Sequence, residues 1–366
     1  MNPKTVFCPH EDCVARGHIG KGNITIHSKK EKRYRCKECG GTFSERKGSA
    51  LYRLHRPAEM MVTVLKLLSH GCPIPAIVAA YELDERTIAD WQQKSGQHAK
   101  AVHETLVEQP REHKQVQSDE LRLKIFSAVL WIAMSIAPVS RLWLGAEVSH
   151  TRGRDFITSM MKRTARCCKG TVLLVTDGLV TYIKAVKKAF SISEGGKGKT
   201  GRPRLISPQT IFLAQVVKSY SSKGKRYVCH GVHKCLCCFG SFVQIGMALK
   251  NSTGGLLNTA CIERFNATLR QSIAGFARKS RYLFHKQEIV ESAVYWVGTC
   301  YNFCTVHRSL SSQLPTTPAM AAGITDHLWS VKELLEYKVR PQPWVFKGRG
   351  RRSKKTLERI KKWATF

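Results

Sequence analysis

Acidic residues are scarce in this sequence. Only 26 Asp and Glu stand against 60 Lys and Arg, which gives a formal net charge of +34. A surface this basic repels itself unless it meets a polyanion, so nucleic acid is the leading predicted partner. The 43% hydrophobic content is enough for a buried core, which excludes a wholly disordered basic chain.

Long apolar runs are also missing. No stretch approaches the roughly 18 residues that cross a membrane, and the start MNPKTVFCPH lacks the apolar segment of a signal peptide. No long basic amphipathic anchor stands out, which makes an anionic membrane the weaker partner. We therefore expect a cytoplasmic, nucleoid-associated protein without membrane attachment.

Cysteine is too rare for a disulfide scaffold, at 14 of 366 residues, but several cysteines are paired at short spacing. Paired, reduced thiols favour metal ligation, and Zn²⁺ prefers a tetrahedral set of thiolates. Residues 1–50 bury little core, so a metal would supply most of their folding energy. We predict a structural zinc ribbon at 1–50 with the ligands Cys8, Cys13, Cys36 and Cys39. The wide gap in the first pair leaves His10 as an alternative to one cysteine.

A second group of cysteines and histidines lies between 229 and 238. It contains Cys229, His230, His233, Cys235, Cys237 and Cys238. A second zinc site is one interpretation, but the spacing fits no metal-binding pattern, and buried or surface thiols are the simpler one.

Residues 51–103 are predicted to form a helix-turn-helix module. Apolar spacing indicates three helices between 57 and 103, with Asp84 as the N-cap of the third. A short helix, a tight turn and a longer helix are typical of this DNA-binding motif, which would bring Arg86, Thr87 and Gln93 near the groove. An ordinary three-helix bundle remains the alternative. The polar segment 104–117, which contains Pro110, is interpreted as a linker.

The segment 118–340 is predicted to be a mixed α/β core. Alternation at Leu121, Leu123 and Ile125 indicates a first strand, and two further strands follow at 129–134 and 142–148. A helix, a short apolar run typical of a central buried strand at 172–175, and another helix come next. The last strand of the core is not located by the pattern. Residues 341–366 form a basic tail, which we expect to be solvated.

Three of the few carboxylates lie where a cation site could be built. Asp119 begins the first predicted strand, and Asp177 ends the buried strand, where α/β sheets place their sites. Glu263 lies on a predicted helix whose apolar stripe is Ile262, Phe265, Leu269, Ile273 and Phe276. Each alone could be structural, as a strand cap, a turn or a surface residue. Together, three converging carboxylates can hold two Mg²⁺ or Mn²⁺ ions, which suits in-line attack at a phosphodiester.

These motifs resemble those of DDE transposases of the insertion-sequence-one type, which have a ribonuclease-H-like catalytic core. The resemblance rests on Ser118-Asp119-Glu120, on Leu174-Val175-Thr176-Asp177-Gly178 and on the helix Ile262-Glu263-Arg264-Phe265-Asn266-Ala267-Thr268-Leu269-Arg270. The order of zinc ribbon, helix-turn-helix and core is also similar. The resemblance implies DNA cleavage and strand transfer of an insertion element, with DNA ends and target DNA as partners and a homo-oligomer at synapsis.

The resemblance also assigns roles to individual residues. It implies that Asp119, Asp177 and Glu263 hold the metal ions, with Glu120 as a substitute for Asp119 because only one of two adjacent strand residues should face the site. Asn266 and Arg270 would contact the DNA backbone or orient a metal carboxylate, and Arg278 and Lys279 would bind phosphate. A non-catalytic DNA-binding regulator and a structure-specific nuclease on the same core are the alternatives.

Overall fold

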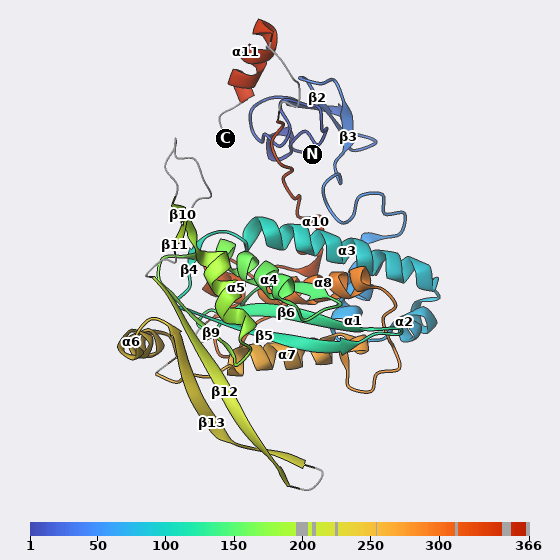
Figure 1. Cartoon of the computed structure of the whole chain (residues 1–366). Helices are drawn as coiled ribbons and strands as arrows, with labels where there is room; N and C mark the ends of the chain where they lie inside the picture. Colours follow the sequence, from blue (N-terminus) through green and yellow to red (C-terminus); the bar gives the residue numbers. More distant parts are fainter. Residues whose placement is uncertain are drawn as a thin grey trace. The chain divides into compact units, whose positions relative to one another are not determined.

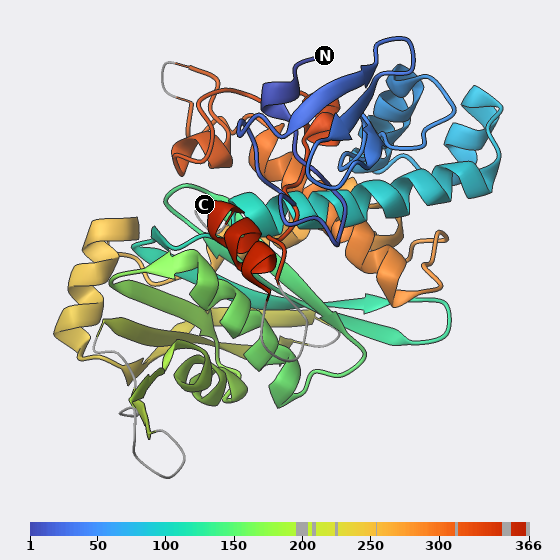
Figure 2. The same ribbon diagram turned by 90° about the horizontal axis from the view of Figure 1, so that it is seen from above.

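The computed structural model describes residues 1–194, 204–206, 210–223, 226–253, 255–311, 314–345 and 353–363. The chain divides into two compact units (Figures 1 and 2). Unit 1 contains Met1–Glu59 together with Leu335–Phe366, and unit 2 contains Met60–Leu334. This division differs from the five consecutive segments predicted from the sequence. The three helices and the core belong to one unit, and the two ends of the chain belong to the other.

Unit 1 is built on a small antiparallel sheet. Its strands lie in the order β1 (Ile24–Ser28), β2 (Arg33–Cys36) and β3 (Thr42–Ser44), after a short 3₁₀ turn at Pro3–Thr5. The C-terminal helix α11 (Lys354–Trp363) packs onto this ribbon, because Trp363 is buried in its core and Lys362 Nζ lies 2.7 Å from Glu38 Oε1.

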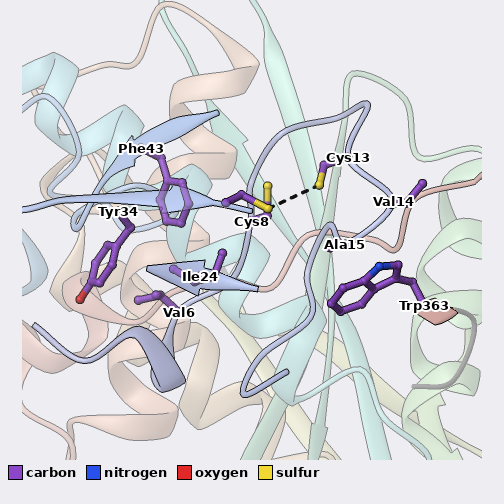
Figure 3. Packing of buried hydrophobic residues seen from close by; sticks show 10 residues of the cluster. Val6, Cys8, Cys13, Val14, Ala15, Ile24, Tyr34, Phe43 and Trp363 are labelled. Atoms are coloured by element: carbon purple, nitrogen blue, oxygen red, sulfur yellow. Dashed lines mark hydrogen bonds between the residues drawn. The ribbon is translucent and has the colours of Figure 1, made fainter. Parts of the chain in front are cut away.

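The expectation that the basic tail at 341–366 is solvated is therefore wrong for α11. The contact depends on a single apolar residue of α11, Trp363, which the basic composition of the segment concealed. Figure 3 shows the indole of Trp363 beside Val14 and Ala15.

The three helices predicted for the helix-turn-helix module are present. They are α1 (Ala58–Ser69), α2 (Ile74–Tyr81) and α3 (Glu85–Leu106), and Asp84 caps α3 by accepting a hydrogen bond from the Arg86 N–H at 2.8 Å. The predicted cap is confirmed. Within unit 2, α3 lies against α8 (Gln287–Phe303), so closely that a Cβ on Gly96 would come within 2.2 Å of the Ser292 carbonyl oxygen.

The predicted linker at 104–117 is wrong. The segment contains the end of α3, the short strand β4 (Arg111–Glu112) and the start of β5 (Gln115–Lys124). Its polar residues are buried and hydrogen-bonded rather than solvated, as at Gln117 and Ser118, and this concealed the strand in the sequence pattern.

Unit 2 contains a six-stranded mixed sheet in the order β13-β12-β9-β5-β6-β7. The antiparallel strands are β5, β6 (Val129–Ala137) and β7 (Leu142–Ser149), and β9 (Val172–Asp177) and β12 (Ile211–Lys223) run parallel to β5. The predicted order of three antiparallel strands, a helix, a buried strand and a helix is confirmed. The last strand, which the sequence left unplaced, is β12, and β13 (Arg226–Phe239) pairs with it as a hairpin. The side chains of the 229–238 cysteines and histidines lie outside the described residues.

Helices cover both faces of this sheet (Figure 1). On one side, the Ser118 hydroxyl meets that of Ser135, which meets Thr164 of α4 (Arg154–Cys167), with α5 (Thr181–Phe190) beside it. On the other side, Gln117 bonds to the start of α7 (Ala260–Ser272). The remaining elements are β8 (Cys168–Lys169), β10 (Ile192–Glu194), β11 (Arg204–Ile206), α6 (Phe242–Thr253), the 3₁₀ turn η2 (Ala274–Phe276), α9 (Pro318–Ala321) and α10 (Val331–Glu336). Among the described residues, no helix is long and apolar enough to cross a membrane.

Candidate functional site

Strand β5 holds two adjacent carboxylates between the helical layers. Gln117 Oε1 accepts hydrogen bonds from the backbone N–H groups of Cys261 and Ile262 at 3.0 and 3.1 Å, which fixes the start of α7 against one face. Because side chains alternate along a strand, Asp119 points to this α7 side and Glu120 to the side of α4 and α5. The sequence had predicted Asp119 at the start of this strand, whereas it lies in the middle of β5.

Asp177 brings a third carboxylate to the same place. It ends β9, as predicted, directly after Thr176, which is the last residue of that strand to pair with β5. The carboxylate oxygens of Asp119, Glu120 and Asp177 can lie within 4.8 Å of one another. The expectation that only one of the two β5 residues can reach the site is therefore wrong. The pairing between β5 and β9 ends at Ser118 and Thr176. After this point, side chains from both faces of β5 can reach Asp177.

Glu263 approaches the same edge from α7. Its carboxylate accepts a hydrogen bond from the Thr259 hydroxyl at 2.6 Å and is not one of the three clustered groups. One turn later, Asn266 is buried, and its Nδ2 donates to Asp119 Oδ2 at 2.9 Å. Of the two roles expected for Asn266, the geometry favours orienting the carboxylate over contacting the DNA backbone. The predicted apolar stripe from Ile262 to Phe276 is buried, which fixes this orientation of the helix.

The clustering of the carboxylates makes ionisation of Asp119 and Glu120 less favourable. Burial and the neighbouring charges of Glu120, Asp177 and Glu263 raise the pKa of Asp119 to about 6. Burial also raises the pKa of Glu120. Such shifts are expected where several carboxylates share a desolvated site without a cation between them.

Arg152 places a positive charge beside two of these carboxylates. Its Nε and Nη2 donate to Glu120 Oε2 at 3.0 and 2.5 Å, and Nη2 lies 3.4 Å from Asp177 Oδ2. The other oxygen of Glu120, Oε1, is buried, and the Tyr182 hydroxyl interacts with this carboxylate. Oxygen donors at this spacing are suited to a hard divalent cation. No sequence pattern pointed to Arg152, because its position depends on the turn after β7 folding back over the sheet.

The four predicted cysteines form a second candidate metal centre, in unit 1. Cys8 Sγ lies 3.7 Å from Cys39 Sγ, and Cys13 Sγ lies 3.8 Å from Cys36 Sγ. All four sulfurs can lie within 4.8 Å of one another. A disulfide needs about 2.05 Å, whereas a tetrahedron with metal–sulfur bonds of about 2.3 Å has edges of about 3.8 Å. The sulfurs are therefore spaced for one tetrahedral metal ion, and His10 is not a member of the group.

The clustered thiols shift one another's pKa in opposite directions. Hydrogen bonding to Cys13 and Cys8 lowers the pKa of the Cys36 thiol, whereas the same cluster raises the pKa of Cys8 and of Cys13. Figure 3 shows Cys8 and Cys13 in the buried core of the ribbon, which also contains Phe43 and Ile24. Because this core is small, an ion that joins four ligands from separate turns would contribute much of its stability.

The predicted DNA-contacting residues lie on accessible surfaces of unit 2. Arg86 is exposed at the start of α3, and Thr87 and Gln93 are half-exposed farther along that helix. Arg270, Arg278 and Lys279 line one cavity together with Arg122 and Lys124, two residues that belong to none of the sequence motifs. No protein-family model matches the chain, and a search of curated proteins found no match.

Proposed function

We propose that the protein is a DNA transposase that cleaves DNA and joins an insertion element to a target, using divalent ions held by Asp119, Asp177 and Glu263. The observation that carries the proposal is that carboxylates of the neighbouring central strands β5 and β9 meet where the pairing of these strands ends, beside the first turn of α7. The strand order, with three antiparallel strands followed by two parallel ones, supports a ribonuclease-H-like core.

The chain's own residues prepare this edge for a phosphodiester. Mg²⁺ or Mn²⁺, when bound, would activate the attacking oxygen and stabilise the leaving one. Asn266 holds Asp119 in place through its hydrogen bond to Oδ2. Arg152 neutralises Glu120 and Asp177, and its guanidinium is a suitable donor to a phosphate that approaches them. Glu120 is buried and holds Arg152, so we assign it a positioning role beside the three metal carboxylates.

DNA recognition is assigned to the parts outside this edge. We propose that Zn²⁺ is held by the four ribbon cysteines, and that Arg86, Thr87 and Gln93 of α3 contact the element ends. Arg270, Arg278 and Lys279 would contact backbone phosphate. Because synapsis brings two ends together, the active form would be a homo-oligomer.

The substitution Asp177→Asn tests the catalytic assignment. It keeps the shape of the side chain and removes one metal-binding charge, so strand transfer of the DNA that flanks the reading frame should be abolished while binding of that DNA is kept. Asp155→Asn is the matched control, because Asp155 is exposed in the first turn of α4 and outside the carboxylate cluster. Equal strand transfer by both variants would contradict the proposal.

The same assay separates the alternatives. A non-catalytic regulator would bind the flanking DNA and show no metal-dependent cleavage in the wild-type protein. A structure-specific nuclease would cleave branched or hybrid substrates in preference to the flanking DNA.

A further inference from the structure

A cavity of about 360 Å³ in unit 2 is lined by positively charged residues. They come from three segments: Arg122 and Lys124 from β5, Arg270 from α7, and Arg278 and Lys279 from the loop after η2. No acidic residue lines the cavity, and none of the five cations forms an ion pair within the described part of the chain. Because side chains alternate along β5, those of Arg122 and Lys124 lie on the Glu120 face, and the cations on the α7 side are Arg270, Arg278 and Lys279. Three uncompensated charges at one cavity repel one another, which favours an anionic ligand.

The cavity lies at a defined distance from the carboxylate edge. Arg122 follows Asp119 by three residues on β5, which at about 3.3 Å per residue is about 10 Å. Arg270 follows Glu263 by seven residues on α7, which at about 1.5 Å per residue is also about 10 Å. Two independent elements therefore give the same separation. The cavity is therefore only a few nucleotides from the carboxylates along a DNA strand.

Exposed aromatic rings lie next to the cavity. Phe126, at the tip of the β5–β6 hairpin, is 68% exposed, and its ring centroid is 4.8 Å from that of His285. The Phe126 N–H donates to the Phe284 carbonyl at 2.8 Å, which ties the hairpin tip to the loop that carries Arg278 and Lys279. Phe126 is two residues from Lys124. A cationic groove with an exposed ring beside it is the combination that binds unpaired nucleic acid, because every base has a face that can stack.

We propose that the cationic cavity and Phe126 form one binding site for an unpaired DNA strand. The cavity holds a backbone phosphate a few nucleotides from the reacting one, and an adjacent base stacks on Phe126. This inference rests on the proposed function only in taking DNA as the substrate. It requires no metal ion and no catalytic step, so it can fail or succeed independently of cleavage.

Binding of fluorescein-labelled oligothymidylate and of a duplex of equal length, measured by anisotropy with EDTA present, tests the site in the full-length protein. The double variant R278A/K279A should weaken binding of both DNAs and reduce the salt slope of log Kd by about 1. Phe126→Ala should weaken oligothymidylate binding about tenfold and duplex binding much less. Lys250→Ala and Phe242→Ala are matched controls, because both residues are exposed on α6.

Loss of DNA binding supports the proposed site only in variants that remain folded. All the substituted side chains are exposed, so thermal unfolding of each variant should match the wild type, and loss of binding then reports the site. Wild-type affinity and salt slope in R278A/K279A, or an equal effect of Phe126→Ala on both DNAs, would overturn the proposal. Displacement of oligothymidylate by inorganic phosphate at matched ionic strength would also overturn it, since the cavity would then take a free anion.

Discussion

The raised pKa of Asp119 predicts that its carboxylate destabilises the metal-free protein. Folding raises this pKa from 3.8 to about 6, mainly through burial and the charge of Glu120. The folded state therefore holds the proton more tightly than the unfolded chain. Unfolding releases a proton between about pH 4 and pH 6, and stability falls as the pH rises through that window. Above it, the penalty is constant at about 3 kcal/mol.

The substitution Asp119→Asn removes this penalty while its side-chain oxygen can still accept the hydrogen bond from Asn266. In EDTA at about pH 7.5, the variant should be more stable than the wild type by up to about 3 kcal/mol, and the gain should shrink by about 1.4 kcal/mol at about pH 5. Urea unfolding followed by tryptophan fluorescence measures both differences. The exposed substitution Asp155→Asn should change neither.

Divalent ions should cancel most of this difference in stability. Mg²⁺ at a hundred times its Kd would stabilise the wild type by about 2.7 kcal/mol and the Asp119→Asn variant much less. A variant that is less stable than the wild type in EDTA at neutral pH, or a gain that does not change with pH, would refute the claim that the carboxylates repel one another in a shared site.

Two further predictions concern the packing of each unit. Trp363→Ala should destabilise the ribbon by about 3–5 kcal/mol and speed the release of zinc to a colorimetric chelator, because α11 loses the side chain that it buries there; an unchanged release rate would show that α11 does not support the ribbon. Gly96→Ala should lower the melting temperature of unit 2, because its Cβ would come within 2.2 Å of the α8 backbone, whereas Gly246→Ala on α6 has open space and should not. Equal melting temperatures for these two variants would contradict the close approach of α3 and α8.

Much of the core could be predicted from local pattern. The run from Val172 to Val175 marked a strand buried on both faces, and Asp177 followed at its end. The stripe beside Glu263 identified α7 and its buried side. These features are local, because periodicity within one element determines them. The cysteine pairs were equally readable, since the short spacing within each pair determines which sulfurs can share a metal.

The features that were missed depend on contacts between distant segments. The start of β5 was hidden because Gln117 and Ser118 are polar and bury their side chains by hydrogen bonding to other elements. Arg152 reaches Glu120 only after β7 has folded against β6. Trp363 packs on a ribbon more than three hundred residues away in the sequence. Composition identified the tail as basic and could not show which residues it would meet.

We propose that the carboxylate edge performs metal-dependent chemistry on DNA phosphodiesters. Nicking of supercoiled plasmid by the wild type, Asp177→Asn and Asp155→Asn, each with Mn²⁺ and with EDTA, measures this activity. Nicked product is expected only with Mn²⁺, at equal rates for the wild type and Asp155→Asn, and none is expected for Asp177→Asn. Nicking by Asp177→Asn at the wild-type rate, or no nicking by a wild-type protein that binds DNA and Mn²⁺, would contradict the proposal.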